Sequence, residues 1–138
     1  MTPKPLRRAA STTLLASLGA AALLLTSGCA NMAASAPAPA MMSSGALVGA
    51  NGMTLYTFDR DAAGSGKSVC NGPCAALWPP LMAGASDQPS GAYTVVMRDD
   101  GGRQWAYKGK PLHYYKEDKK AGDRSGDNFR DVWHIIKE

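Results

Sequence analysis

Two cysteines four positions apart, Cys70 and Cys74, are the residues of this 138-residue chain whose chemistry is easiest to predict. The Asn71-Gly72-Pro73 segment between them supplies the tight turn that a short disulfide bridge needs. The alternative is a copper site in which both thiolates and His113 ligate the ion, because soft sulfur ligands suit Cu(I). We expect the structural disulfide, and neither a metal nor another cofactor.

The third cysteine, Cys29, ends a segment with the features of an export signal. Three basic residues within the first eight precede an apolar run over Ala9–Leu25 that contains no acidic residue. The Leu25-Thr26-Ser27-Gly28-Cys29 segment resembles a bacterial lipobox, in which a dedicated peptidase cuts just before a lipid-modified cysteine. Because Thr26 is unusual at its place, cleavage by the ordinary signal peptidase near Ala33 or Ala34 stays an open alternative.

These features predict a lipid-anchored protein of the cell envelope. We expect a signal peptide over residues 1–28, then a lipidated Cys29 and a flexible linker over residues 29–44, which are rich in Ala, Ser and Pro. The folded part would face the periplasm or the exterior. In similar lipoproteins of Gram-negative bacteria, an acidic residue directly after the lipidated cysteine retains the protein on the inner membrane. This chain has Ala30 at that position, which favours the outer membrane in such a host. Two thiols left in an oxidising compartment favour a disulfide.

The charge balance argues against a nucleic-acid partner. The chain carries 15 basic and 11 acidic residues, and three of the basic residues leave with the signal peptide, so the mature protein has a net charge of +1. No basic footprint for nucleic acid remains. We therefore expect the membrane as a partner through the lipid anchor, together with an unidentified envelope protein or small ligand.

An internal repeat is the strongest organising signal in the chain. Laying residues 53–61 over residues 110–118 keeps one constant offset and predicts two copies, over about 46–84 and 104–138. The aligned pairs are Leu55 with Leu112, Tyr56 with His113, Phe58 with Tyr115, Asp61 with Asp118 and, more loosely, Trp78 with Trp133.

Turn signals predict two β-hairpins, one in the first copy and a second one, around Asp99-Asp100-Gly101-Gly102, that links the copies. Asn51-Gly52 is the dipeptide that a type I′ turn prefers, because both central residues need a positive φ. The expected fold class is mostly β: a small single domain over residues 45–138, made of two diverged β-hairpin repeats with one short helix. We expect strands over residues 46–50, 53–58, 93–98, 104–107 and 129–136, and the helix over residues 73–78.

A family resemblance rests on the first copy, where Tyr56, Phe58 and Asp61 form a Tyr-x-Phe-x-x-Asp pattern. The chain resembles the bacterial secreted-repeat lipoproteins defined by a Tyr-x-(Phe/Trp/Tyr)-x-x-Asp motif. The Cys-x-x-x-Cys pair followed by Trp-Pro-Pro-Leu is similar to the family pattern as well. The second copy departs from the motif, since His113 stands where tyrosine is expected, while Tyr115 and Asp118 match. The resemblance implies no activity, because the function of the family is unknown.

The candidate site residues each have a plain structural interpretation. Tyr56 and Phe58 share one face of a strand, so we expect them in the core, with a ligand platform as the alternative. Trp78 and Trp133 are expected to be structural aromatics as well.

Asp61 and Asp118 precede loops in which a carboxylate accepts backbone N–H bonds, and a paired acid and base is the alternative. No catalytic constellation stands out, so we expect a binding or structural module rather than an enzyme. A copper-binding or thiol redox accessory that uses Cys70, Cys74 and His113 is the second candidate.

Overall fold

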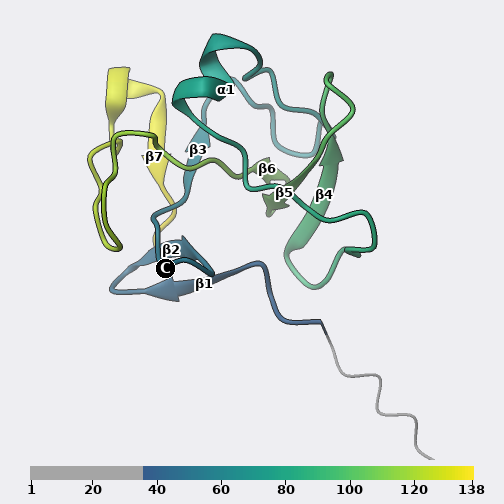
Figure 1. Cartoon of the computed structure of the whole chain (residues 1–138), viewed down its shortest axis with the longest axis horizontal. Helices are drawn as coiled ribbons and strands as arrows, with labels where there is room; N and C mark the ends of the chain where they lie inside the picture. The colour runs from purple at the N-terminus through teal and green to yellow at the C-terminus, as the bar shows by residue number, and fades with distance from the viewer. Residues whose placement is uncertain (1–35) are drawn as a thin grey trace, which may run out of the picture. The chain divides into compact units, whose positions relative to one another are not determined.

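Short antiparallel strands are the main regular secondary structure of residues 36–138, the part of the chain that this computed structural model describes (Figure 1). The expected signal peptide, the lipidation site Cys29 and the linker up to residue 35 lie outside the described residues. Within residues 36–138, no helix has the length and apolar character needed to cross a membrane. The strands form three small sheets, ordered β1-β2, β3-β7 and β4-β5-β6, so the mostly β fold is confirmed.

The first copy begins earlier than expected. β1 (Ala40–Ser43) lies in the last part of the segment expected to be a flexible linker, and it pairs with β2 (Ala46–Gly49). Ser44 and Gly45, with φ of 50° and 78°, form the two-residue type I′ connection between these strands. The linker boundary at residue 44 was therefore wrong, because Ala40, Ala46 and Leu47 are buried and hold the hairpin to the core.

The turn at Asn51-Gly52 is not the type I′ turn that its sequence predicts. Gly52 has a positive φ of 75°, whereas Asn51 is not among the positive-φ residues. The Gly52 N–H donates to the Gly49 carbonyl (2.9 Å), and the Gly49 N–H donates to the Met53 carbonyl (2.9 Å). This pattern is that of a three-residue loop closed by a G1 bulge, in which only the final residue needs the left-handed conformation.

Residues 93–111 use the same two turn types in the opposite order. β4 (Tyr93–Met97) and β5 (Arg103–Tyr107) pair where the second hairpin was predicted, with Gly101 at φ 82° in the connection. β5 then turns through Lys108-Gly109 into β6 (Lys110–Pro111), and both turn residues have a positive φ, 48° and 80°. The type I′ turn thus occurs at the position that the repeat aligns with Asn51-Gly52.

Strands of the two copies pair with each other. β3 (Tyr56–Phe58) of the first copy pairs with β7 (Trp133–Ile135) of the second. On the other edge of β3, Tyr56 and His113 exchange both backbone hydrogen bonds, of 2.8 and 3.0 Å. Because Tyr56 and His113 are equivalent residues of the repeat, their antiparallel pairing places a local pseudo-two-fold axis between the copies.

Two further elements complete the domain. α1 (Pro73–Leu77) lies where the short helix was predicted and has proline in its first turn, where a missing N–H is tolerated. The strand expected over residues 129–136 is wrong in its first half, because residues Phe129–Asp131 form a 3₁₀ turn, η1, and only β7 is extended. Left-handed φ values at Asn128, Arg130 and Asp131 (60°, 52° and 56°) are incompatible with a strand there.

The alternation of side chains along β3 and the preceding Leu55 divides the core into two clusters. Leu55 belongs to one cluster with Leu47, Trp105 and Leu112. Tyr56 and Phe58 belong to the other, which also holds both structural tryptophans. The second cluster lies where the two copies meet, and it forms the base of the candidate site.

Candidate functional site

Four aromatic rings stack face to face between the two copies, in the order Phe58, Trp133, Trp78, Tyr115. Successive ring centroids are 4.3, 3.9 and 4.1 Å apart, and the interplanar angles are 11°, 4° and 21°. Phe58 and Trp78 belong to the first copy, whereas Trp133 and Tyr115 belong to the second. The pseudo-two-fold axis therefore relates the two tryptophans at the middle of this four-ring stack.

Strand register builds the stack. Phe58 and Trp133 are directly opposite each other in the β3–β7 pair, where cross-strand side chains touch. The segment before Tyr115 runs beside Trp78, because the Tyr114 N–H donates to the Pro79 carbonyl (2.7 Å) and the Lys116 N–H donates to the Leu77 carbonyl (2.9 Å). All four rings are buried. The sequence predicted Trp78 and Trp133 as structural aromatics, but it did not predict their mutual contact.

Next to the stack, a side chain of each copy forms a hydrogen bond with an aspartate carboxylate of the other copy. The Tyr56 hydroxyl donates to Asp118 Oδ2 at 2.6 Å, and His113 Nε2 lies 2.9 Å from Asp61 Oδ2. The two bonds are equivalent under the repeat alignment. All four side chains are buried, and Tyr56, Asp61 and His113 are fully so.

The two carboxylates also hold their own loops. Asp61 accepts the Val69 N–H at 2.7 Å and the Ser68 hydroxyl at 3.0 Å. Asp118 accepts the Ser125 N–H at 3.0 Å. The expected loop-stabilising role is therefore present, and it is combined with the bond to the other copy.

Burial raises the pKa of the Tyr56 phenol well above its usual range, and the hydrogen bond to the Asp118 carboxylate raises it further. Tyr56 is thus a hydrogen-bond donor that holds its proton. The alternative of a paired acid and base needs a substrate to reach Asp61 or Asp118, yet both are enclosed in the structure. We assign these side chains to the core of the domain.

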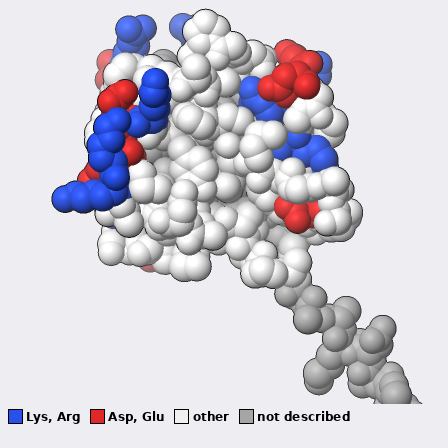
Figure 2. All heavy atoms as spheres, viewed as in Figure 1, with Lys and Arg blue, Asp and Glu red and all other residues white. Residues whose placement is uncertain are grey.

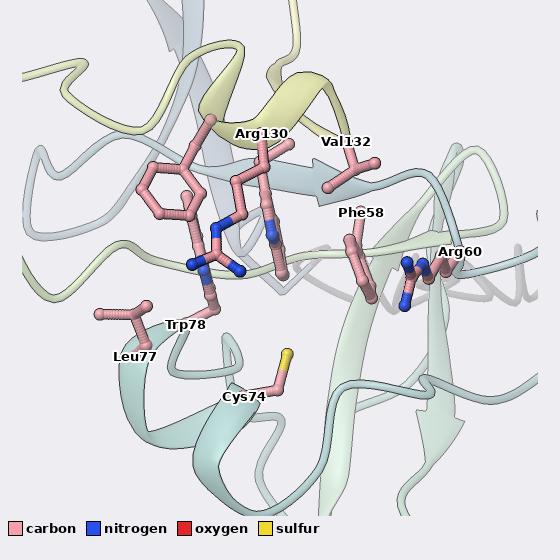
Figure 3. A pocket seen from close by; sticks show the side chains of 9 residues that line it. Phe58, Arg60, Cys74, Leu77, Trp78, Arg130 and Val132 are labelled. Atoms are coloured by element: carbon pink, nitrogen blue, oxygen red, sulfur yellow. The ribbon is translucent and has the colours of Figure 1, made fainter.

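A pocket of about 270 Å³ opens beside the four-ring stack (Figure 3). It is the candidate functional site, because it combines a concave surface with exposed parts of otherwise buried rings. Segments of both copies contribute to it, including α1, η1 and the start of β7. Its apolar lining consists of Phe58, Leu77, Trp78, Phe129, Val132 and Trp133.

The two cysteines lie at the edge of this pocket. Cys70 and Cys74 form a disulfide with a Cα–Cα distance of 5.2 Å; Cys70 is buried, whereas Cys74 is half-buried and lines the pocket. Among residues 36–138, no group of three histidine, cysteine or acidic side chains could hold a metal ion. His113, the third ligand of the copper alternative, has its Nδ1 3.2 Å from the Trp78 carbonyl and its Nε2 beside Asp61.

Residues 43–82 and 94–137 both match a protein family described as a secreted repeat of unknown function. The chain belongs to this secreted-repeat family. The two matched segments correspond to the two copies of the internal repeat, so the repeat and the resemblance found in the sequence are confirmed. Comparisons with curated proteins and with solved structures find no match.

The secreted-repeat pattern of this chain describes the interior of the domain rather than an exposed centre. Tyr56 and Asp61 reach across to the other copy, and of the pattern's three residues only Phe58 lines the pocket. His113 replaces the motif tyrosine in the second copy without loss of the cross-copy bond, because an imidazole also donates to a carboxylate.

A buried arginine connects the sheet of the second copy to the disulfide loop of the secreted-repeat domain, and sequence reasoning missed it. The Arg98 guanidinium donates to Gln104 Oε1 (2.7 Å), the Cys70 carbonyl (3.0 Å) and Asn71 Oδ1 (3.2 Å). Arg98 is only 5% exposed. The only signal in the sequence was its place at the end of a strand, which is typical of a solvated side chain as well.

Charge is distributed unevenly over one face of the domain (Figure 2). Figure 2 shows charged side chains of both signs at the two flanks of one face, with a mostly uncharged band between them. At the pocket, Arg60 and Arg130 are the charged lining residues, and no acidic residue lines it. The site therefore combines an apolar interior with positive charge at its rim.

Proposed function

We propose that this secreted-repeat protein is a lipid-anchored, non-catalytic binding module of the cell envelope, and that its pocket takes a small, largely apolar ligand. One observation carries the proposal: a pocket of about 270 Å³, lined by four aromatic residues, lies where the two copies meet. Pockets that bind small molecules are concave and mostly apolar, with few polar groups. Both copies are needed to form it, which gives the duplication a functional meaning.

The lipid anchor is supported by the sequence around Cys29 and by the secreted nature of the family. Each buried methylene contributes about 0.8 kcal/mol to membrane binding, and two or more acyl chains together anchor a protein stably. Ten residues separate Cys29 from the first residue of β1, Ala40. Such a segment spans at most about 36 Å when fully extended, so the domain would stay close to the membrane surface.

Membrane fractionation tests the anchor. We expect the wild-type protein in the membrane fraction with incorporated fatty acid, and the Cys29→Ser variant in the soluble fraction without it. The Cys70→Ser, Cys74→Ser double variant is the control, because it removes the other two cysteines but leaves the lipid acceptor Cys29. A Cys29→Ser protein that fractionates like the wild type would contradict the anchor.

Ligand binding to the pocket is tested with 2-naphthamide, a neutral two-ring probe, added to the whole Cys29→Ser chain purified without detergent. We expect binding by calorimetry and a change in tryptophan fluorescence, because Trp78 and Trp133 line the pocket. Val132→Trp fills the pocket and should abolish binding. Val69→Trp is the matched control, since Val69 is 58% exposed and is not part of the lining. Binding that survives Val132→Trp unchanged would refute the pocket as the site.

A thiol redox accessory is the second candidate, and the position of Cys74 in the pocket lining favours it. A thiolate of a partner dithiol would attack Cys74 Sγ and release the Cys70 thiolate. The partner's second thiol would then resolve the mixed disulfide, so that the partner is oxidised and both cysteines are reduced. Reduction of the native protein by a mild dithiol tests this redox role. Cu(I) titration of the reduced form tests the copper-binding alternative that uses the same two cysteines. A disulfide that resists mild dithiol reduction would argue against it.

A further inference from the structure

We propose that the ligand of this pocket is a small planar aromatic carboxylate, and that Arg130 is the main group that binds its anionic end. The inference rests on the proposed ligand-binding function and specifies the class of ligand. It follows from three observations: the side chains of Arg60 and Arg130 have no hydrogen-bond or ion-pair partner among the described residues, the backbone at Arg130 is left-handed, and the pocket is small.

The pocket arginines differ from the other arginines of the domain. Residues 36–138 contain five arginines, and the three outside the pocket, Arg98, Arg103 and Arg124, all donate side-chain hydrogen bonds. Within the same part of the chain, Arg60 and Arg130 make neither an ion pair nor a side-chain hydrogen bond. Asp59, the acidic neighbour of Arg60 in sequence, is 3.0 Å from His134 Nε2. Two guanidinium groups therefore remain available to an anion.

The backbone around Arg130 is held in an unfavourable conformation. Arg130 has φ 52° and ψ 26°, and its neighbour Asp131 has φ 56°, a region that costs a non-glycine residue about 1–2 kcal/mol. Hydrogen bonds on both sides maintain the turn, from the Asn128 N–H to the Trp133 carbonyl (2.8 Å) and from the Val132 N–H to the Phe129 carbonyl (3.2 Å). Residues kept in such conformations cluster at ligand-binding sites. Here the turn places Phe129 and Arg130 together at the pocket.

Figure 3 shows how the cations lie relative to the apolar lining. The Arg130 side chain extends from η1 toward Trp78 and Leu77, while Arg60 lies at the other end of the site, beyond Phe58. The Arg130 guanidinium carbon is 5.5 Å from the centroid of the Phe129 ring, so this cation already lies against an aromatic face. A flat ring in the pocket would place a carboxylate beside Arg130, and Arg60 would add positive potential from the opposite end.

Size and chemistry select the ligand. A volume of about 270 Å³ lies just under the usual range for drug-sized ligands, about 300–1,000 Å³, so it suits a molecule of one or two rings. A guanidinium matches a carboxylate with two parallel hydrogen bonds, and it is more weakly hydrated than an ammonium group. An aromatic carboxylate satisfies both the apolar interior and the unpaired cations.

The test compares 2-naphthoate with 2-naphthamide, which have nearly the same shape but differ in charge, on the whole Cys29→Ser chain. Because Arg130 is exposed, we expect the carboxylate to bind about three- to tenfold more tightly. Arg130→Gln should bring this ratio close to one and leave 2-naphthamide binding unchanged, whereas Arg60→Gln should lower the ratio less. Lys120→Gln is the control, since it removes the same charge from an exposed residue outside the pocket lining.

The outcomes separate this inference from the function on which it rests. Equal binding of both probes would overturn the carboxylate preference while the apolar pocket stands as a binding site. Binding of neither probe would overturn both. A preference for 2-naphthoate that survives Arg130→Gln would place the anion elsewhere and refute the role of Arg130.

Discussion

At the level of single residues, the polar core of the domain depends on two reciprocal bonds, Tyr56 to Asp118 and His113 to Asp61. Each carboxylate is buried, and each receives one donor from the other copy and at least one backbone N–H from its own loop. Leaving such a group without its partner costs about 1–3 kcal/mol, more if it is charged. The bonds therefore couple the loop of one copy to the strand of the other.

Stability at alkaline pH should depend on Tyr56. The unfolded chain releases the phenol proton near pH 10, whereas the folded protein holds it to a higher pH because its pKa is raised by burial and by Asp118. Above pH 10 the unfolded state then binds fewer protons than the folded state, so the free energy of unfolding falls as pH rises.

Urea unfolding between pH 7 and 11 measures this effect. Tyr56→Phe should lower stability at pH 7, because Asp118 loses its donor, and should make the alkaline decline less steep. A smaller decline should remain, since burial also raises the pKa of Tyr93 and Tyr114. Parallel declines in the wild type and Tyr56→Phe would contradict this role of Tyr56.

We expect Arg130 to lower the stability of the domain, although it contributes to ligand binding. Arg130→Gly should raise the free energy of unfolding by about 0.5–1 kcal/mol, because glycine adopts a left-handed φ without strain but has greater freedom in the unfolded chain. Lys120→Gly, at a residue without a positive φ, should have no such gain. Chemical denaturation of the three proteins gives the comparison, and an equal effect of both substitutions would show that the η1 backbone is not strained.

Residue types predicted part of this site and missed the rest for identifiable reasons. Asp61 and Asp118 were expected to accept backbone N–H groups in the loops that follow them, and they do. Their second partners lie 52 and 62 residues away in sequence, so local spacing could not reveal them. Arg60 and Arg130 were missed as well, because an exposed arginine among mixed charges looks the same whether or not it borders a pocket.

At the level of elements, Arg98 joins β4 to the disulfide loop that precedes α1. Its hydrogen bonds end on Gln104 and on the Cys70 carbonyl, both buried, so the guanidinium satisfies groups that water does not reach. Arg98→Met should lower the free energy of unfolding by about 3 kcal/mol, since it leaves buried acceptors unpaired.

Arg103→Met is the matched control for this prediction. Arg103 lies on the adjacent strand β5 and is more exposed, with its guanidinium donating to the Gly84 and Asp87 carbonyls. Bonds of this kind contribute less, so the loss should be about 1 kcal/mol. Thermal or urea unfolding decides the matter: similar losses in both variants would mean that Arg98 does not connect these elements.

The turns show that a hairpin can be predicted from the sequence while the conformation of its turn is not. β4 and β5 were found almost to the residue, because β-branched and aromatic residues alternate on both sides of an Asp-Gly-rich turn. Asn51-Gly52 suits a type I′ turn by composition, yet the register of β2 leaves three residues in the loop. Lys108 adopts the left-handed conformation that its type does not favour, because the β5–β6 register leaves room for two residues only.

At the level of the whole domain, the repeat in the sequence identified equivalent residues but not their partners. The constant offset aligned Tyr56 with His113 and Phe58 with Tyr115, and that alignment is equally consistent with two independent hairpins or with interlocked ones. The structure has the interlocked arrangement, in which β3 pairs with β7 and each carboxylate binds the other copy. Only long-range contacts separate these possibilities, and a single sequence does not contain them.

Interlocking leads to a prediction about fragments of the described domain. We divide the domain at an exposed connection between the copies, into residues 36–88 and residues 89–138. Each fragment should be largely unfolded on its own. It supplies only two rings of the four-ring stack and one half of every cross-copy hydrogen bond. When mixed, they should associate and recover the near-ultraviolet circular dichroism of the stacked tryptophans. Trp133→Ala in the second fragment should weaken this recovery strongly, whereas Lys137→Ala, at an exposed residue beyond β7, should leave it unchanged. A fragment that folds alone, with dispersed amide resonances and cooperative unfolding, would show that the copies are autonomous and that the pocket is assembled by docking rather than by shared folding.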